Sequence, residues 1–180
     1  PELKEKYKEV SSDMAKINFA VRARAAGVIF LRKQLTASIS RVPTEIPVID
    51  MLKDKWPKKV KELTMQVHSN FEGIWSQNVI GYVKGSEFPD SLILVSAHYD
   101  HLGLQGEAIF PGANDNASGT AVLLSLAKYF ADPAHKPKHS IAFIAFGGEE
   151  AGLIGSRHYV EKNPIWPLAN TRFILNLDLM

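Results

Sequence analysis

The sequence of 180 residues contains no cysteine. Disulfides and thiolate metal sites are therefore excluded, and any metal ion must be held by histidine and carboxylate ligands. The net charge is only +2, which gives no reason to expect a nucleic acid or a membrane surface as a partner. No apolar run approaches the roughly 18 residues that a membrane-spanning helix needs, so no membrane span is predicted.

The sequence has enough apolar material for a sizeable core, since 46% of its residues are hydrophobic. Residues 2–26 show the spacing of an amphipathic helix, and residues 28–31 are predicted to form a short strand. Residues 49–56 are predicted to form a short helix that ends before Pro57. This N-terminal part contains no cluster of reactive side chains, which indicates a packing role.

The middle of the chain changes to a two-residue period. Leu63, Met65 and Val67 alternate with polar residues, and residues 74–83 form a second candidate strand. This pattern predicts an antiparallel pair with a turn near Asn70.

Three apolar runs follow, at residues 92–97, 141–146 and 173–177. Such runs are typical of strands that are buried on both faces of a parallel sheet. Residues 119–130 carry apolar side chains on one helical face, and residues 153–162 are also predicted to be helical. Because strands and helices alternate, we predict an α/β fold with a mixed, mainly parallel sheet flanked by helices.

Histidine or acidic residues, which are common metal ligands, stand at the end of each predicted buried strand. In an open α/β sheet the ligand site lies beyond the carboxyl ends of the parallel strands. The loop after the first strand returns into a helix, so it can bend over the same place. The residues expected to converge there are His98, Asp100, Asp115, Glu149, Glu150 and Asp178.

The five carboxylates in this group would repel one another, and burying them is costly without a compensating cation. A pair of divalent ions resolves this conflict, and histidine with carboxylates suits zinc in a hydrolytic site. Taken singly, most of these residues also have a simpler explanation, as a hydrogen-bonded histidine, a turn former, a helix cap or a solvated surface group. Asp178 is harder to explain in this way, because it closes a buried strand. His101 is close enough to line the site, but nothing in the sequence requires it to bind metal. The histidines at positions 68, 135, 139 and 158 are expected to be surface or structural residues.

Four motifs appear in order along the chain: SAHYDHLG, GANDNASGT, FGGEEAGLIGS and NLDLM. Together they resemble the co-catalytic zinc aminopeptidases, the group that includes bacterial leucyl aminopeptidases and glutamate carboxypeptidase. The resemblance covers residues 78–180, and residues 18–56 are more faintly similar to the latter part of a protease-associated domain. We therefore expect an N-terminal segment over residues 1–57 and the N-terminal part of a metallopeptidase catalytic domain over residues 58–180.

The resemblance also implies roles for individual residues. His98 and Asp178 would bind one zinc ion, Asp115 would bridge two ions, and Glu150 would bind the second ion. Asp100 is similar to the aspartate that orients the histidine ring and raises its basicity.

Glu149 matches the general base of the family. The implied function is zinc-dependent removal of N-terminal residues from peptides with a free N-terminus. Two zinc ions would lower the pKa of a bridging water, and Glu149 would take its proton. Three alternatives stay open: a carboxypeptidase or dipeptidase of the same fold, a glutaminyl cyclase-type acyltransferase, and a non-catalytic binding ectodomain.

The second zinc site still needs one histidine, which the family takes from a later segment, so we expect that ligand after Met180. The chain is therefore expected to be truncated at its C-terminus and to depend on the remaining C-terminal part of the same protein. Alone it should show weak or no activity and should hold no more than one tightly bound ion. Because the family is commonly exported, a secreted or periplasmic location is expected.

Overall fold

The structure is a computed structural model that describes residues 12–39, 43–68 and 72–180. Two compact units divide the chain, one within residues 12–73 and the other over residues 74–180 together with residues 37–39. The predicted domain boundary after residue 57 remains a prediction. Within the described part of the chain, no helix is both long and apolar enough to cross a membrane.

The first unit contains one helix and two paired strands. Helix α3 (Asp13–Arg22) begins after Ser12, whose side chain accepts a hydrogen bond from the backbone N–H of Ala15 at 3.1 Å. Strands β1 (Val28–Arg32) and β2 (Val48–Leu52) pair in parallel and are followed by a short 3-10 turn, η1 (Lys53–Lys55). The predicted helix over residues 2–26 is thus confirmed for residues 13–22, but it ends earlier than predicted, since residues 23–26 are not helical. Residues 2–11 lie outside the described ranges.

Two predictions for this unit are wrong. Residues 49–52, which were predicted to start a helix, belong to strand β2, where Ile49 pairs with Ile29. The β-branched side chains of Val48 and Ile49 suit a strand, and pairing with β1 outweighs the local helical pattern. Residues 60–68 form no strand despite their alternating pattern, and the predicted turn near Asn70 lies outside the described residues.

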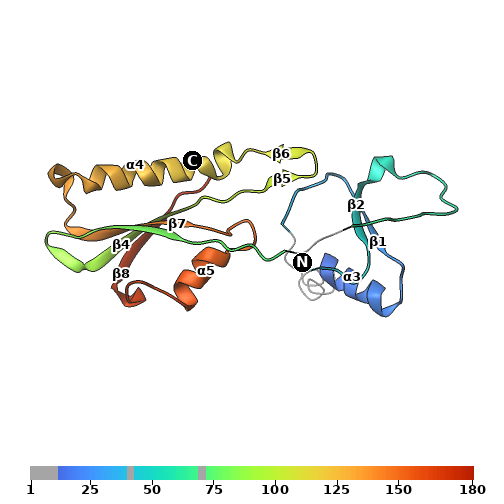
Figure 1. Ribbon diagram of the computed structural model, residues 1–180, viewed down its shortest axis with the longest axis horizontal. Coiled ribbons are helices and arrows are strands. Elements are labelled where there is room, and N and C mark those ends of the chain that lie inside the picture. The colour runs from blue at the N-terminus through green and yellow to red at the C-terminus, as the bar shows by residue number, and fades with distance from the viewer. Residues whose placement is uncertain (1–11, 40–42, 69–71) are drawn as a thin grey trace, which may run out of the picture. The chain divides into compact units, whose positions relative to one another are not determined.

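The second unit is built on a four-stranded sheet with the order β3-β7-β4-β8 (Figure 1). Its strands are β3 (Val79–Val83), β4 (Phe88–His98), β7 (His139–Phe146) and β8 (Thr171–Asn176). Strand β4 runs parallel to both β7 and β8, whereas β3 pairs with β7 in the antiparallel sense. The predicted mixed, mainly parallel sheet is therefore confirmed.

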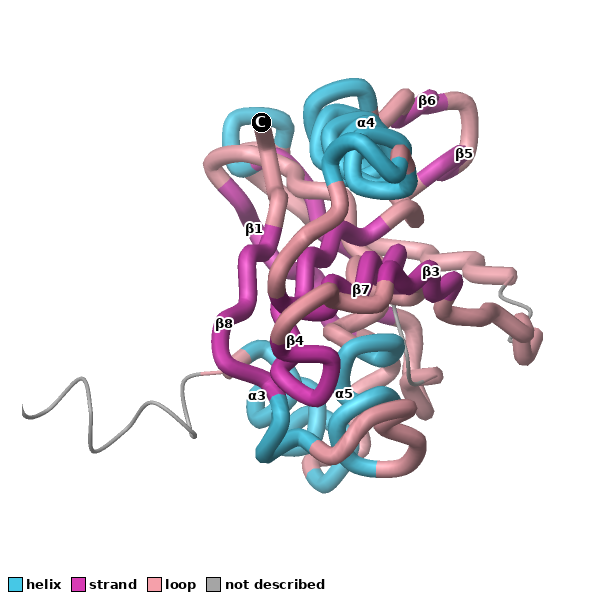
Figure 2. The backbone as a smooth tube through the Cα atoms, turned by 90° about the vertical axis from the view of Figure 1, so that its left-hand side faces the viewer, coloured by secondary structure: helices cyan, strands magenta, loops and turns pink. Residues whose placement is uncertain are grey.

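Helices α4 (Gly119–Ala131) and α5 (Ile154–Glu161) cover opposite faces of this sheet (Figures 1 and 2). Alternate residues of β4 point to the two helices, as the pleat of a strand requires. Val95 and Ala97 pack with Leu123 of α4, while Leu94 packs with Tyr159 of α5. Both faces of β4 are thus buried, which explains its nearly continuous apolar sequence.

Shorter elements complete this unit. Strands β5 (Gly103–Gln105) and β6 (Ala108–Phe110) form a hairpin after β4. An irregular turn, η2 (Ala113–Ser118), then leads directly into α4. Two 3-10 turns, η3 (Pro133–His135) and η4 (Leu168–Asn170), precede β7 and β8.

Tyr159 gives the second unit a predictable sensitivity to alkaline pH. Its side chain is buried against Leu94 and Ile144, and this burial raises the pKa of its hydroxyl. The unfolded chain therefore loses this proton first, so the free energy of unfolding should fall as the pH rises above about 10. The variant Tyr159→Phe has no such group and should show a smaller fall.

Urea unfolding at about pH 8 and about pH 11 measures this difference. Tyr129→Phe is the matched control because Tyr129 is 50% exposed, and it should lose as much stability at high pH as the native chain. An identical pH dependence for Tyr159→Phe and the native chain would contradict the prediction.

Candidate metal centre

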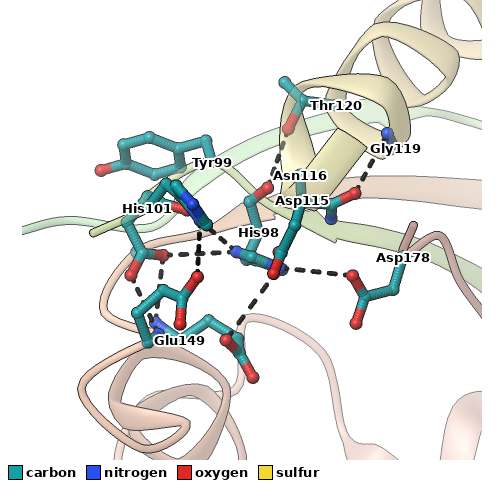
Figure 3. A network of polar contacts seen from close by, with 12 residues as sticks. His98, Tyr99, His101, Asp115, Asn116, Gly119, Thr120, Glu149 and Asp178 are labelled. Carbon is teal, nitrogen blue, oxygen red and sulfur yellow. Dashed lines mark hydrogen bonds and ion pairs between the residues drawn. The ribbon is translucent and has the colours of Figure 1, made fainter. Parts of the chain in front are cut away.

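His98 stands at the centre of the candidate site, at the carboxyl end of the central strand β4 (Figure 3). Its side chain is only 4% exposed, because α4 and the neighbouring strands enclose this end of the sheet. The hydroxyl of Thr120, in the first turn of α4, donates a hydrogen bond to the backbone carbonyl of His98 at 2.9 Å. This hydrogen bond joins the start of α4 to the end of β4 at the residue that carries the imidazole.

Two aspartates approach the same ring nitrogen of His98. Its Nε2 atom lies 3.2 Å from Oδ1 of Asp115 and 3.4 Å from Oδ1 of Asp178. Asp115 comes from the turn η2, and Asp178 follows β8, so three separate segments meet here. One ligand atom from each of these residues lies within 4.8 Å of the other two, which is the spacing of a metal-binding group.

The charges around His98 favour a cation. Burial by itself lowers the pKa of the imidazole, but the backbone carbonyl of Asp100 and the nearby carboxylates outweigh it. The net result is a pKa above the ordinary value for histidine. The carboxylates that raise it belong to Glu149, Asp178 and Asp100. The negative charge of these carboxylates attracts a positive charge to the site, either a proton or a metal ion.

Asn116 connects the Asp115 turn to the segment that carries Asp178. Its side-chain amide donates to the carbonyl of Leu177 at 2.9 Å and accepts from the N–H of Leu179 at 3.3 Å. The same oxygen accepts from the N–H of Gly119 at 3.1 Å. Asn116 is 2% exposed, so this buried amide binds the residues on both sides of Asp178 and sets its distance from Asp115.

Asp100 links the two halves of the site through its carboxylate. Oδ1 accepts a hydrogen bond from the backbone N–H of Glu149 at 3.0 Å, and Oδ2 accepts one from Glu150 at 3.1 Å. The ring of His98 is contacted by the backbone of Asp100 and not by its carboxylate at hydrogen-bonding distance. Nδ1 of His98 lies 3.1 Å from the Asp100 carbonyl oxygen. Asp100 therefore positions both glutamates as well as the histidine.

Replacing Asp100 by asparagine should weaken zinc binding. The asparagine side chain has only one oxygen, so it can accept a hydrogen bond from the backbone N–H of Glu149 or of Glu150 but not from both. Its NH₂ group would face the other backbone N–H, and the turn that carries the two glutamates would be held less firmly. Loss of such a supporting partner typically lowers metal affinity by about 10–100-fold. A zinc titration against a chelating dye measures the change, and Asp90→Asn, an exposed position of the same strand, is the control. Equal affinity in both variants would show that the carboxylate does not support the ligands.

Glu149 lies at the edge of the first ligand group. Its Oε2 atom is 4.0 Å from Nε2 of His98. Burial raises the pKa of the Glu149 carboxyl, the charge of His98 lowers it, and the carboxylates around it add to the net rise. Of the residues that the structure describes, the two candidate ligand groups do not include Glu149, which leaves its carboxylate free for other chemistry.

A second candidate group contains His101, Asp115 and Glu150. Nδ1 of His101 lies 2.7 Å from Oε1 of Glu150. Asp115 belongs to both groups, so the structure places two three-residue sets side by side with one shared carboxylate. This sharing is the pattern of a two-metal site, in which the ions lie about 3.5–4 Å apart.

The donor atoms of both groups fit zinc. Imidazole nitrogen and carboxylate oxygen are its usual ligands when cysteine is absent. Nδ1 of His101 and Oε1 of Glu150 are both shielded from solvent and pair with each other, without meeting hydrogen-bond geometry.

The structure therefore brings together all six predicted site residues and adds others that the sequence reasoning missed. Asn116 was overlooked because its motif, Asn114-Asp115-Asn116, looks like an ordinary turn sequence. The burial of the Asn116 side chain would have indicated its structural role. Burial cannot be predicted from the sequence at a single position in a turn. The ligand, base and orienting roles assigned to the six residues remain predictions.

Comparisons with known proteins agree with this picture. The sequence pattern of peptidase family M28 matches residues 78–180. Aminopeptidase YwaD of Bacillus subtilis (strain 168) is 35% identical over 181 residues, covering 93% of this chain and 38% of that protein. A glutamate carboxypeptidase 2 homolog of Caenorhabditis elegans is 40% identical over 106 residues, covering 57% of this chain and 13% of that protein.

Among solved structures, BSAP, a zinc aminopeptidase from Bacillus subtilis, is 39% identical, with a TM-score of 0.45 over 57% of this chain and 24% of that chain. The chain thus spans well under half the length of these relatives. Its fold and its clustered candidate ligands are those of an α/β metallohydrolase domain. From the match over residues 78–180, the chain belongs to peptidase family M28.

Proposed function

We propose that the protein is a zinc-dependent aminopeptidase that hydrolyses N-terminal residues from peptides. The observation that carries this proposal is the position of Glu149, 4.0 Å from the His98 ring nitrogen but outside both candidate ligand groups. A carboxylate in this place can act as a general base without competing for the metal. The names of the relatives, which include zinc metalloproteases, support zinc as the cofactor.

Two zinc ions are proposed, one held by His98, Asp115 and Asp178 and the other by a group that includes Asp115 and Glu150. When bound, such ions lower the pKa of a water molecule and polarise the scissile carbonyl. Glu149 takes a proton from the attacking water on its carboxylate and then passes this proton to the leaving amine. Asp100 holds the turn of Glu149 through the hydrogen bond to its backbone N–H, so the base keeps a fixed distance from the ligands.

A cavity of about 730 Å³ adjoins the base and supports a peptide substrate. Its lining includes His98, Glu149 and Asp178, and apolar side chains such as Tyr159 and Phe173. Ligand sites of this kind are mostly apolar with a few polar groups that fix orientation. The scissile bond can therefore approach the carboxylates while an apolar side chain occupies the cavity.

The wider setting of the protein is proposed from the family resemblance of the sequence. The substrate carries a free N-terminus, a C-terminal part of the same protein completes the catalytic domain, and the protein is secreted or periplasmic. Tests of catalysis therefore require the complete protein, since the chain described here is proposed to turn over weakly alone.

The decisive experiment compares an unblocked peptide with the same peptide acetylated at its N-terminus, with zinc and after chelation. Release of the first residue from the unblocked peptide alone, lost on chelation and restored by zinc, is the expected result. Equal cleavage of the acetylated peptide from its C-terminus would overturn aminopeptidase action in favour of a carboxypeptidase. Loss of ammonia or water from an N-terminal glutamine or glutamate peptide, seen by mass, would indicate a cyclase. No conversion in any assay would favour a binding protein.

A further inference from the structure

We propose that Asn78 is a positioning residue for catalysis, because its side-chain amide holds both ends of the loop that carries Glu149. The inference rests on the proposed function in taking Glu149 as the general base. Asn78 immediately precedes β3, the strand at one edge of the sheet, and was not among the predicted site residues. It acts on the reaction through the loop and touches neither the substrate nor the metal.

The loop over residues 147–155, called here the Glu149 loop, runs from the end of β7 into the first turn of α5. It is folded on itself by backbone hydrogen bonds. The N–H groups of Gly152 and Leu153 both donate to the carbonyl oxygen of Glu149, at 2.7 and 2.8 Å. These bonds lie within the loop, so contacts with the rest of the unit decide where the carboxylate of Glu149 lies.

The side chain of Asn78 contacts both ends of the Glu149 loop. Its Oδ1 atom accepts a hydrogen bond from the backbone N–H of Gly147 at 3.2 Å, and its Nδ2 atom donates to the carbonyl oxygen of Gly155 at 2.9 Å. Asparagine suits this position, because its short side chain offers a donor and an acceptor together. Since both bonds come from one planar amide, Asn78 fixes the distance between the two ends of the loop.

The two ends of the loop also pack closely against each other and against Asn78. A β-carbon on Gly155 would overlap the carbonyl oxygen of Gly147 and Oδ1 of Asn78. Glycine at position 155 therefore lets the first turn of α5 come into contact with the end of β7. At this crowded junction, removing the amide of Asn78 would take the hydrogen-bond partner from the N–H of Gly147.

Asp100 holds the middle of the same loop, where its carboxylate accepts hydrogen bonds from the backbone N–H groups of Glu149 and Glu150. If the ends of the loop are released, the loop can pivot about this contact. Such a movement changes the distance between the Glu149 carboxylate and the ring of His98, which is 4.0 Å in the structure. A displacement of about 1 Å in an active site can lower the rate by about 100-fold.

Steady-state kinetics on the complete protein at saturating zinc test the proposal. Asn78→Ala removes both hydrogen bonds and should lower kcat by about 100-fold. KM should change little, because Asn78 does not line the cavity beside the base. Saturating zinc keeps the metal bound, so the fall cannot come from lost metal. Asn163→Ala makes the same chemical change at an exposed position after α5 and should keep the native kcat.

A second variant, Asn78→Asp, has nearly the same shape as the native side chain and tests the proposal even if Asn78→Ala does not fold. Its carboxylate can accept the hydrogen bond from Gly147 but cannot donate one to Gly155. Because one of the two bonds is kept, its kcat should lie below that of the native enzyme and above that of Asn78→Ala.

Hydrogen exchange of the complete protein reports on the loop independently of turnover. The backbone amides of Gly152 and Leu153, which close the loop, should exchange faster in both Asn78 variants than in the native protein. The amides of the central strand β4 should exchange at native rates, since the change is confined to the loop. This pattern together with the loss of kcat supports the proposal.

Three outcomes overturn it. Native kcat in folded Asn78→Ala, or in Asn78→Asp if the alanine variant does not fold, would show that Asn78 does not position the base, while the proposed peptidase function would stand. Faster exchange throughout β4 would assign Asn78 a general role in stability instead. If the native protein hydrolyses no peptide, the proposed function fails and the catalytic role of Asn78 fails with it, whereas hydrogen exchange still shows whether Asn78 holds the loop.

Discussion

Replacing Glu149 by glutamine should lower kcat of the complete enzyme by about 10²–10⁴-fold, the usual contribution of a general base. Glutamine has nearly the same shape but cannot take a proton from water. Zinc content should be unchanged, because Glu149 belongs to neither candidate ligand group among the described residues. The backbone N–H that binds Asp100 is also retained, so the turn should keep its conformation.

Steady-state kinetics on an unblocked peptide, with elemental analysis of the same samples, measure both quantities. Glu161→Gln is the matched control, because it makes the same chemical change at an exposed position of α5. Its kcat should equal that of the native enzyme. If Glu149→Gln retains full activity, the base must be another group; if it loses zinc instead, Glu149 is a ligand.

Replacing Asp115 by asparagine should have the broadest effect on metal binding, because this carboxylate is shared by both candidate groups. The amide oxygen can still approach a metal ion, but the negative charge that offsets two cations is lost. We expect both sites to weaken, and catalysis in the complete enzyme to fall with them. Variants of Asp178 or Glu150 should each disturb mainly one site.

Thermal unfolding gives a direct measure of this effect. A ligand at about 100 times its Kd stabilises the folded state by about 2.7 kcal/mol per site. Added zinc should therefore raise Tm of the native chain and of Asp90→Asn, an exposed control, but raise Tm of Asp115→Asn much less. An equal zinc-dependent rise in all three proteins would show that Asp115 does not hold the ions.

Most of the second unit could be predicted from the sequence because its signals are strong and local. Strands β4, β7 and β8 each contain an apolar run, and a histidine or carboxylate stands at or just beyond the end of each one. The predicted burial of β8 on both faces is wrong, since Phe173 and Ile174 are each 59% exposed. The rule that ligands lie beyond the carboxyl ends of parallel strands was then enough to place His98, Asp115 and Asp178 together.

The remaining features depend on contacts between distant segments. Strand β2 looks helical in isolation, and its pairing with β1 decides its conformation. Asn116 looks like a turn residue until β8 brings Leu177 and Leu179 to its side chain. His101 looks like an extra histidine until the fold brings the carboxylate of Glu150 to 2.7 Å from its ring.

The hydrogen bond between Asn116 and Leu177 joins segments that are made at different times during protein synthesis. The chain emerges from its N-terminus, so His98 and Asp115 are made before the segment that ends at Asp178. At about 5–20 residues per second, the interval between residues 98 and 178 is roughly 4–16 seconds. During this time the first ligand group lacks its last carboxylate, and Asn116 has no carbonyl of Leu177 to bind. The complete group of His98, Asp115 and Asp178, which we propose to hold zinc, therefore becomes available only after the segment that follows β8 has been made.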